Sequence, residues 1–462
     1  MQHQKHLSLP VLQACFPRNG KYKNGPWKSQ GQIMEFVAEH PGTVIIESPT
    51  GSGKTAVEYA IIAASRKSEK GPAFLVTPNK TILEQIMQEG FPDLKVALGR
   101  NEHKCLYYKE DVGADEVPCS MLRDCPHRID QSTGKTSEPG VSPCPYLLQK
   151  YEARQGSMIA CTMAFYLFSQ LFSRAFDDPA CLVIDEAHRI ADVVRSSLSY
   201  EISDWHLKQS IELLEKIGAG EAKILKKFLT ALKRIAKAKK RAAYEETLLD
   251  DDEIRRLISI LEGIDPDALI EKVERAVRKR EIDPVNDRVV LKKLEMLVRD
   301  LRRYIHSFEY SLEAEGRKPL NYTCAFYKGE KGENGKVQYK LVIKCYYVAP
   351  LIRKILARST AAFSATIGKP DVFGYETGIR GAYLSLDSAF PVDHTRIYMP
   401  SNTPNLAMKA RGKRDMTKTL RQIARACKRF AQKGHRSLVV TISNAEREKF
   451  LMLAKEEGVD AV

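Results

Sequence analysis

The chain has 462 residues, a formal net charge of +15 and 43% apolar residues. This length predicts two to four domains, and the apolar content is ample for their cores. No apolar run approaches the ~18–20 residues of a membrane span, and the first six residues lack a signal-peptide core. We therefore expect a protein that is not secreted and has no membrane partner: cytoplasmic and nucleoid-associated in a prokaryote, nuclear otherwise. The positive charge indicates a polyanionic partner, with general solubility as the alternative.

The first expected elements are a capped helix and a buried strand. The helix begins near Trp27 and carries Gln30 in its first turn. The strand, residues 43–46, is short, apolar and β-branched, and an apolar helix over residues 56–64 follows the intervening loop. A strand, a Gly-rich loop ending in Gly-Lys-Thr and a helix form the context of a phosphate-binding loop.

In such a loop, Gly51 and Gly53 allow backbone N–H groups to surround a phosphate at the start of a helix. Lys54 reaches the β- and γ-phosphates of ATP, and the Thr55 hydroxyl holds Mg²⁺. The strict pattern opens with Gly, whereas this chain has Ser48. The predicted phosphate-binding residues are Thr50, Gly51, Ser52, Gly53, Lys54 and Thr55.

Residues 73–80 predict the next strand and its loop, and residues 81–86 open another helix. This alternation of strands and helices predicts an α/β protein with a doubly wound parallel sheet. The loop after the strand lies on the ligand face of such a sheet, so Thr77 and Asn79 are candidates for nucleic-acid contact. Ordinary turn and helix-cap chemistry explains them almost equally well.

The alternation stops at Leu98 and resumes near Gly156. The segment between them, residues 99–155, is polar and is called here the cysteine insert. Its residues 130–143 are mostly Gly, Ser, Thr and Pro, so it cannot build a core of its own, and thiolates on a metal would hold it together. The uneven spacing suits an iron–sulfur cluster, but zinc or no metal stays open on spacing alone. The four candidate ligands are Cys105, Cys119, Cys125 and Cys144.

A second buried strand, residues 181–184, leads into Asp185, Glu186, Ala187 and His188. At the carboxyl end of a strand, Asp185 can hold Mg²⁺ and Glu186 can orient or deprotonate the attacking water. Two adjacent carboxylates at a strand end are poorly solvated unless a cation or substrate uses them. Together with the phosphate-binding loop, they indicate an NTPase.

Long charged helices are expected from about residue 192 to 321, in a segment called here the helical insert. Its basic rim either lines a nucleic-acid path or is a solvated face. Residues 322–348 alternate as a hairpin with its turn at 328–335, and residues 360–366 form a further strand. A second α/β domain is expected from near Asn405, with a helix through 417–423 and a strand at 436–444. Such a domain needs roughly 120–150 residues, so we expect this one to be cut short.

The order of these motifs resembles superfamily 2 helicases of the XPD/DinG family. The resemblance covers nearly the whole chain, and the cysteine insert between two motor motifs makes it specific. The matching positions are Gln30 with Met34, residues 47–55, 77–79, Gly99 with Arg100, Cys105, residues 144–146, 185–188 (a DEAH box), 364–366 and 388–391, and the strand before Thr441.

The resemblance implies a RecA-like P-loop NTPase motor with an inserted iron–sulfur domain and an inserted helical arch, plus the start of a second RecA-like domain. The first motor domain takes residues 1–98, 156–195 and 346–400. The iron–sulfur insert takes residues 99–155 and the arch takes residues 196–345. The second motor domain begins at residue 401, and the family's later motifs, including its arginine fingers, have no counterpart before Val462.

The implied activity is ATP-driven 5′→3′ translocation on single-stranded DNA with unwinding at duplex junctions, in DNA repair or replication. The implied cofactors are ATP, Mg²⁺ and a 4Fe–4S cluster on the four cysteines of the insert. Gln30 would read adenine, Arg100 would support the cluster, and catalysis would fall to Lys54, Asp185, Glu186 and His188. The alternative is a nucleic-acid-binding or regulatory protein with a vestigial or fragmentary motor. An RNA-directed motor is also open, because such motors grip backbone and stacked bases.

Overall fold

The structure is a computed structural model that describes residues 7–68, 71–173, 175–238, 247–313, 323–331, 337–388, 416–441 and 443–461. It divides into two compact units, residues 1–389 and 390–462. The expected start of the second domain, near residues 401–405, lies outside the described residues. Among the residues that are described, no helix has the length and apolar character needed to cross a membrane.

The first unit is built on a seven-stranded sheet in the order β11-β1-β10-β5-β2-β4-β3, and every neighbouring pair is parallel. The predicted parallel α/β core is therefore confirmed. Its strands are β1 (Thr43–Glu47), β2 (Ala73–Thr77), β3 (Leu94–Ala97), β4 (Met158–Thr162), β5 (Cys181–Ile184), β10 (Ser359–Ser364) and β11 (Ala382–Ser385).

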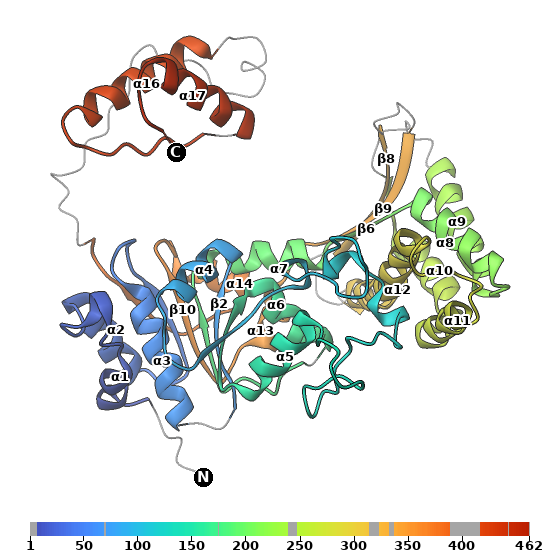
Figure 1. Cartoon of the computed structure of the whole chain (residues 1–462), viewed down its shortest axis with the longest axis horizontal. Helices are drawn as coiled ribbons and strands as arrows, with labels where there is room; N and C mark the ends of the chain where they lie inside the picture. The colour runs from blue at the N-terminus through green and yellow to red at the C-terminus, as the bar shows by residue number, and fades with distance from the viewer. Residues whose placement is uncertain are drawn as a thin grey trace. The chain divides into compact units, whose positions relative to one another are not determined.

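Helices cover both faces of this sheet, because successive strand residues point to opposite sides. Val44 and Ile46 pack into the apolar cluster of one face, and Ile45 packs into that of the other. Figure 1 shows α1, α2 and α3 on one side of the strands and α5, α6 and α13 on the other. The first group is α1 (Leu9–Cys15), α2 (Lys28–Glu39), α3 (Lys54–Ser68) and α4 (Lys80–Gln88). The second is α5 (Pro145–Gln155), α6 (Met163–Phe168), α7 (Ile190–Leu198), α13 (Ala349–Ile355) and α14 (Pro370–Thr377).

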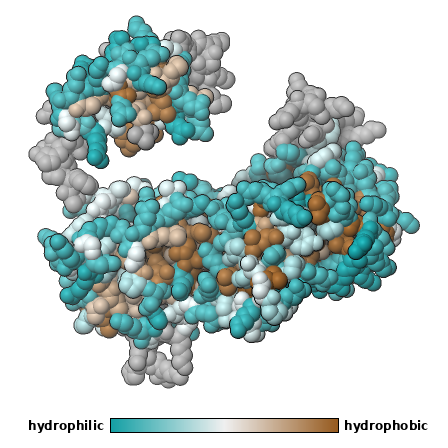
Figure 2. All heavy atoms as spheres, in the orientation of Figure 1, coloured by the Kyte–Doolittle hydropathy of each residue, from teal (hydrophilic) through white to brown (hydrophobic). Residues whose placement is uncertain are grey.

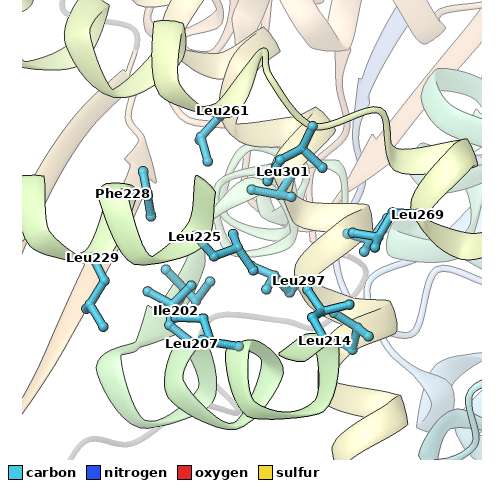
Figure 3. Close-up of a cluster of buried hydrophobic side chains, with 14 of the residues drawn as sticks. Ile202, Leu207, Leu214, Leu225, Phe228, Leu229, Leu261, Leu269, Leu297 and Leu301 are labelled. Carbon is cyan, nitrogen blue, oxygen red and sulfur yellow. The ribbon is translucent and has the colours of Figure 1, made fainter. Parts of the chain in front are cut away.

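The helical insert forms a small antiparallel sheet together with the hairpin that follows it, in the order β6-β9-β8-β7, and from here on the name includes this hairpin, to residue 345. Leucines from its helices meet in one buried cluster, in which Leu207 and Leu214 of one helix lie beside Leu225 of the next (Figure 3). The elements are β6 (Tyr200–Ser203), α8 (Asp204–Lys216), α9 (Glu221–Ala238), β7 (Thr247–Leu248), α10 (Asp251–Leu261), α11 (Pro266–Arg278), α12 (Arg288–Glu313), β8 (Thr323–Lys331) and β9 (Val337–Cys345).

The predicted hairpin is present, but the predicted turn at 328–335 begins too early. Lys328 pairs with Lys340, and the ladder continues to the pair Lys331 and Val337. Gly and Glu in this stretch are typical of turns, yet continuing the ladder satisfies backbone groups that a turn would leave unpaired.

The second unit contains α16 (Thr417–Ala431) and α17 (Asn444–Glu456), which share a small apolar cluster. The predicted strand at 436–444 is wrong: residues 436–441 join no sheet in the described part of the chain, and Asn444 opens α17. Leu438 is 92% exposed and Val440 is 85% exposed. A β-branched run becomes a strand only where neighbouring strands accept its backbone hydrogen bonds.

The visible face of the first unit is mostly hydrophilic, with apolar side chains gathered in patches over the sheet region and the helical insert (Figure 2). A protein of this size keeps such patches on its surface, so they do not by themselves mark a site.

Candidate functional site

The predicted phosphate-binding loop connects β1 to α3. Gly51 has φ 83° and Gly53 has φ 73°, values that favour glycine. A Cβ atom on Gly53 would crowd Nε2 of the buried Gln30, so that side chain would have to move to admit it. Ser48, which departs from the strict pattern, is fully buried and donates a 2.7 Å hydrogen bond to Oγ of Ser52. The serine therefore ties the start of the loop to its end.

Lys54 is the first residue of α3, and its ammonium group turns back over the loop. Nζ donates to the carbonyl oxygen of Ser48 at 3.1 Å and lies 4.0 Å from Oε1 of Glu186. The cation thus lies between the loop and the acid pair. Thr55 follows it in the first turn of α3.

The acid pair lies at the carboxyl end of β5, which is separated from β1 by β10 alone. Asp185 is 7% exposed, and its Oδ1 accepts from the backbone N–H of Glu186 at 2.9 Å. Burial, and next the charge of Glu186, raise the pKa of Asp185 to about 6, although Lys54 opposes them. Glu186 has φ 49°, a left-handed conformation that is strained for a residue with a Cβ. The two carboxyl groups are therefore held together at a cost in free energy.

His188 connects the acid pair to the adjacent strand. Its Nδ1 lies 2.8 Å from Oγ of Ser364 at the end of β10 and 3.3 Å from Oε2 of Glu186. Oγ of Ser364 also accepts from the backbone N–H of Thr366 at 3.1 Å. A change at Glu186 therefore has a direct polar route to the loop after β10.

Glu58 is a member of this site that the motifs did not indicate. It lies on α3, is fully buried, and neither carboxyl oxygen has a hydrogen-bond partner of ordinary geometry. Burial, and then the charge of Asp185, raise its pKa well above the usual value. A glutamate within the otherwise apolar run of residues 56–64 was the available signal.

Gln30 lies against the phosphate-binding loop, fully buried. Its Nε2 donates to the carbonyl oxygen of Gly53 at 2.9 Å, and its Oε1 accepts from the backbone N–H of Trp27 at 2.7 Å. The adenine contact expected of Gln30 stays a prediction. In this structure the amide braces the loop, while the indole of Trp27 is 48% exposed beside Gly53.

Thr77 and Asn79 take the turn-and-cap role that was the alternative to nucleic-acid contact. Oγ1 of Thr77 donates to the carbonyl oxygen of Asn79 at 3.0 Å. Oδ1 of Asn79 accepts from the backbone N–H of Ile82 at 3.1 Å and so caps α4. Local chemistry is sufficient to explain both residues.

The four cysteines of the insert are free thiols. Burial raises the pKa of Cys119; Arg100 opposes this, and Glu295, Cys105 and Cys144 add to it. Burial also raises the pKa of Cys125, and the nearby Cys105 and Cys144 add to this effect. The thiols are therefore close enough to influence one another's ionisation. Even so, among the described residues no three His, Cys, Asp or Glu side chains are arranged to hold a metal ion.

Arg100 lies beside these thiols. Its guanidinium carbon is 5.7 Å from the centre of the Tyr146 ring, and its buried Nε has no hydrogen-bond partner. Such a donor is costly to leave unsatisfied, so an anionic group is the chemistry this position fits.

A parallel sheet with a glycine-rich loop after β1 and a pair of acids after β5, with β10 between these two strands, is the arrangement typical of P-loop nucleotide-binding proteins. Residues 26–207 match the family described as type III restriction enzyme, res subunit. One similar solved structure is an XPD helicase, with 18% identity and a TM-score of 0.44 over 75% of this chain and 59% of that one. Another is a truncated XPD, with 19% identity and a TM-score of 0.47 over 78% of this chain and 99% of that one.

The two solved structures named here are both XPD proteins. The chain spans 59% of the length of the XPD helicase structure. No curated protein matches this chain.

Proposed function

We propose that this chain carries the motor of an ATP-dependent DNA helicase or translocase that moves 5′→3′ on single-stranded DNA, in repair or replication. The observation that supports this most directly is that Lys54 lies between the phosphate-binding loop and Glu186, 4.0 Å from its carboxyl oxygen. The link from His188 to Ser364 then provides a route from the nucleotide site to the rest of the motor.

The chemistry at this site divides among four groups. Lys54 binds the β- and γ-phosphates, and Glu186 orients the attacking water. Thr55 and Asp185 would hold Mg²⁺, which neutralises charge on the phosphates when bound. The donor set fits this ion, because Mg²⁺ prefers oxygen ligands, and Asp185 with the adjacent Glu186 supplies carboxylate oxygens beside the phosphate-binding loop.

The cysteine insert would hold the 4Fe–4S cluster through Cys105, Cys119, Cys125 and Cys144. The donor set fits such a group. The unpartnered Nε of Arg100 fits it as well, since four thiolates and a cluster carry negative charge. The expectation that the insert has no core of its own is wrong, because Tyr108, Val112, Val117 and Leu122 form a small buried cluster within it. When bound, the iron–sulfur cluster would stiffen this insert further, next to the point where we expect DNA strands to separate.

The test is ATP turnover by the natural full-length gene product with and without single-stranded DNA. We expect stimulation by DNA, with matched RNA a weaker competitor, and loss of turnover in Lys54→Ala and Glu186→Gln. A folded protein that binds DNA, but whose ATP turnover DNA does not stimulate, would contradict the motor function and support the regulatory alternative. Iron analysis and absorbance near 400 nm test the cluster, and a colourless protein with stoichiometric zinc would refute it.

A further inference from the structure

The turn that carries Cys119 is embedded in the helical insert. Cys119–Met121 form a single 3₁₀ turn, and Met121 is 1% exposed. Met121 belongs to the same buried apolar cluster as Leu294 and Leu297 of α12. The second cysteine of the insert is therefore followed by a side chain that is part of the core of a different segment.

A buried carboxylate from α12 binds the same turn. Oε1 of Glu295 accepts from the backbone N–H of Ser120 at 2.7 Å and from its Oγ at 2.6 Å. Oε2 of Glu295 accepts from Nζ of Lys292 at 2.8 Å, and Lys292 also donates to the carbonyl oxygen of Val117 at 3.2 Å. Glu295 is only 9% exposed, so these charge-assisted bonds are protected from water.

The electrostatics of Glu295 agree with this geometry. Burial raises its pKa, but Lys292 and both Ser120 bonds outweigh burial and hold the pKa below the usual value. The carboxylate is thus kept ionised by the groups that it positions.

Further contacts surround this buried centre. Arg278 donates two hydrogen bonds to the Asp124 carboxylate, at 2.7 and 3.0 Å. The Tyr108 hydroxyl donates a hydrogen bond to the carbonyl oxygen of Pro284 at 2.9 Å. Arg278 and Asp124 are more than half exposed, so their pair contributes little free energy compared with Glu295.

The other end of the cysteine insert is anchored to the parallel sheet instead. Cys144 immediately precedes α5, and Ala153 of α5 packs into the apolar cluster of the second sheet face. Cys119 and Cys144 are therefore held by two different bodies, the helical insert and the parallel sheet.

We propose that Glu295 is a positioning residue for Cys119, so that the helical insert completes the cysteine site. The cluster part of this inference rests on the proposed function, whereas the positioning of the turn does not. Displacing the helical insert from the sheet would then separate thiols that the site needs together.

The experiment uses the full chain with Glu295→Ala and Glu295→Gln, and with Glu271→Ala as a matched control on the exposed face of α11. Hydrogen exchange is measured over residues 117–122, and iron loss to a chelator is measured after cluster reconstitution. We expect Glu295→Ala to raise the rate of hydrogen exchange and the rate of iron loss by about tenfold or more, because a charged hydrogen-bond acceptor is lost. Glu295→Gln keeps a carbonyl acceptor for the Ser120 N–H, so exchange in it stays closer to wild type.

The proposal would be overturned if residues 117–122 of the Glu295→Ala protein exchanged hydrogen at the wild-type rate. If Glu295→Ala fails to fold, Ser120→Ala tests the proposal instead. This variant leaves the helical insert intact and removes the hydrogen bond from the Ser120 hydroxyl to Glu295. We expect faster iron loss and faster exchange in that variant, and unchanged values of both contradict us. A wild-type protein that takes up no iron refutes the proposed cluster, while the exchange comparison still decides the role of Glu295.

Discussion

Nδ1 of His188 lies 2.8 Å from Oγ of Ser364, and this contact joins the ends of two adjacent parallel strands, β5 and β10. The same nitrogen is 3.3 Å from Oε2 of Glu186. One imidazole therefore spans the acid pair and the loop that leaves the sheet. This arrangement predicts that the hydroxyl of Ser364 couples the nucleotide site to movement elsewhere in the motor.

Replacing Ser364 with alanine is expected to lower DNA-stimulated ATP turnover by about tenfold, the upper range for one neutral hydrogen bond. Turnover without DNA should change much less, because Lys54 and the acid pair stay in place. Steady-state ATPase assays with and without single-stranded DNA measure the ratio. Ser359→Ala, at the other end of β10, is the control, and an equal fall in both variants would contradict the coupling.

Binding of Mg²⁺–ATP is expected to weaken as the pH falls through about 6, the value to which burial raises the pKa of Asp185. A proton and the metal compete for the same carboxylate, so well below this pH the affinity should drop about tenfold per pH unit. Calorimetric titration between pH 5 and 8 measures this. Asp185→Asn should bind more weakly throughout and lose the pH dependence.

The same raised pKa has the opposite consequence for folding. Between the ordinary aspartate pKa and about 6, the folded state binds more protons than the unfolded state. The contribution of Asp185 to the free energy of unfolding is therefore largest at low pH and is lost as the pH rises through about 6.

Replacing Glu58 with methionine is expected to stabilise the nucleotide-free protein by about 1–3 kcal/mol, because a buried carboxyl without a hydrogen-bond partner is removed. Its pKa is raised well above the usual value, so the gain should grow with pH as ionising the buried group becomes more costly. Thermal unfolding at several pH values measures the difference. Glu35→Met, at an exposed position of α2, is the control. A destabilised Glu58→Met protein would show that the Glu58 carboxyl group is satisfied in the wild type.

Replacing Gly53 with alanine is expected to abolish nucleotide binding and to cost about 1–2 kcal/mol, from its positive φ and the close approach of Gln30. Gly31 is a matched control, since it lies inside α2 and a Cβ there meets nothing within 4 Å. Gly31→Ala should stabilise the protein by up to about 1 kcal/mol. Nucleotide binding by fluorescence titration, with thermal unfolding in parallel, distinguishes the two. Normal binding in Gly53→Ala would mean that the loop tolerates a different path.

The sequence by itself determined the parallel α/β core and the candidate nucleotide residues, because their signals are local. A β-branched run, a glycine pair and a lysine lie within a dozen residues, and the paired acids directly follow their strand. Only the tertiary structure decided the rest. The contacts of Ser48 with Ser52 and of Glu295 with Ser120, and the effect of the Asp185 charge on the pKa of Glu58, depend on which side chains the fold brings together. Residues 436–441 illustrate the same dependence: Leu438 and Val440 have strand propensity but are exposed, because no neighbouring strand in the described part of the chain pairs with them.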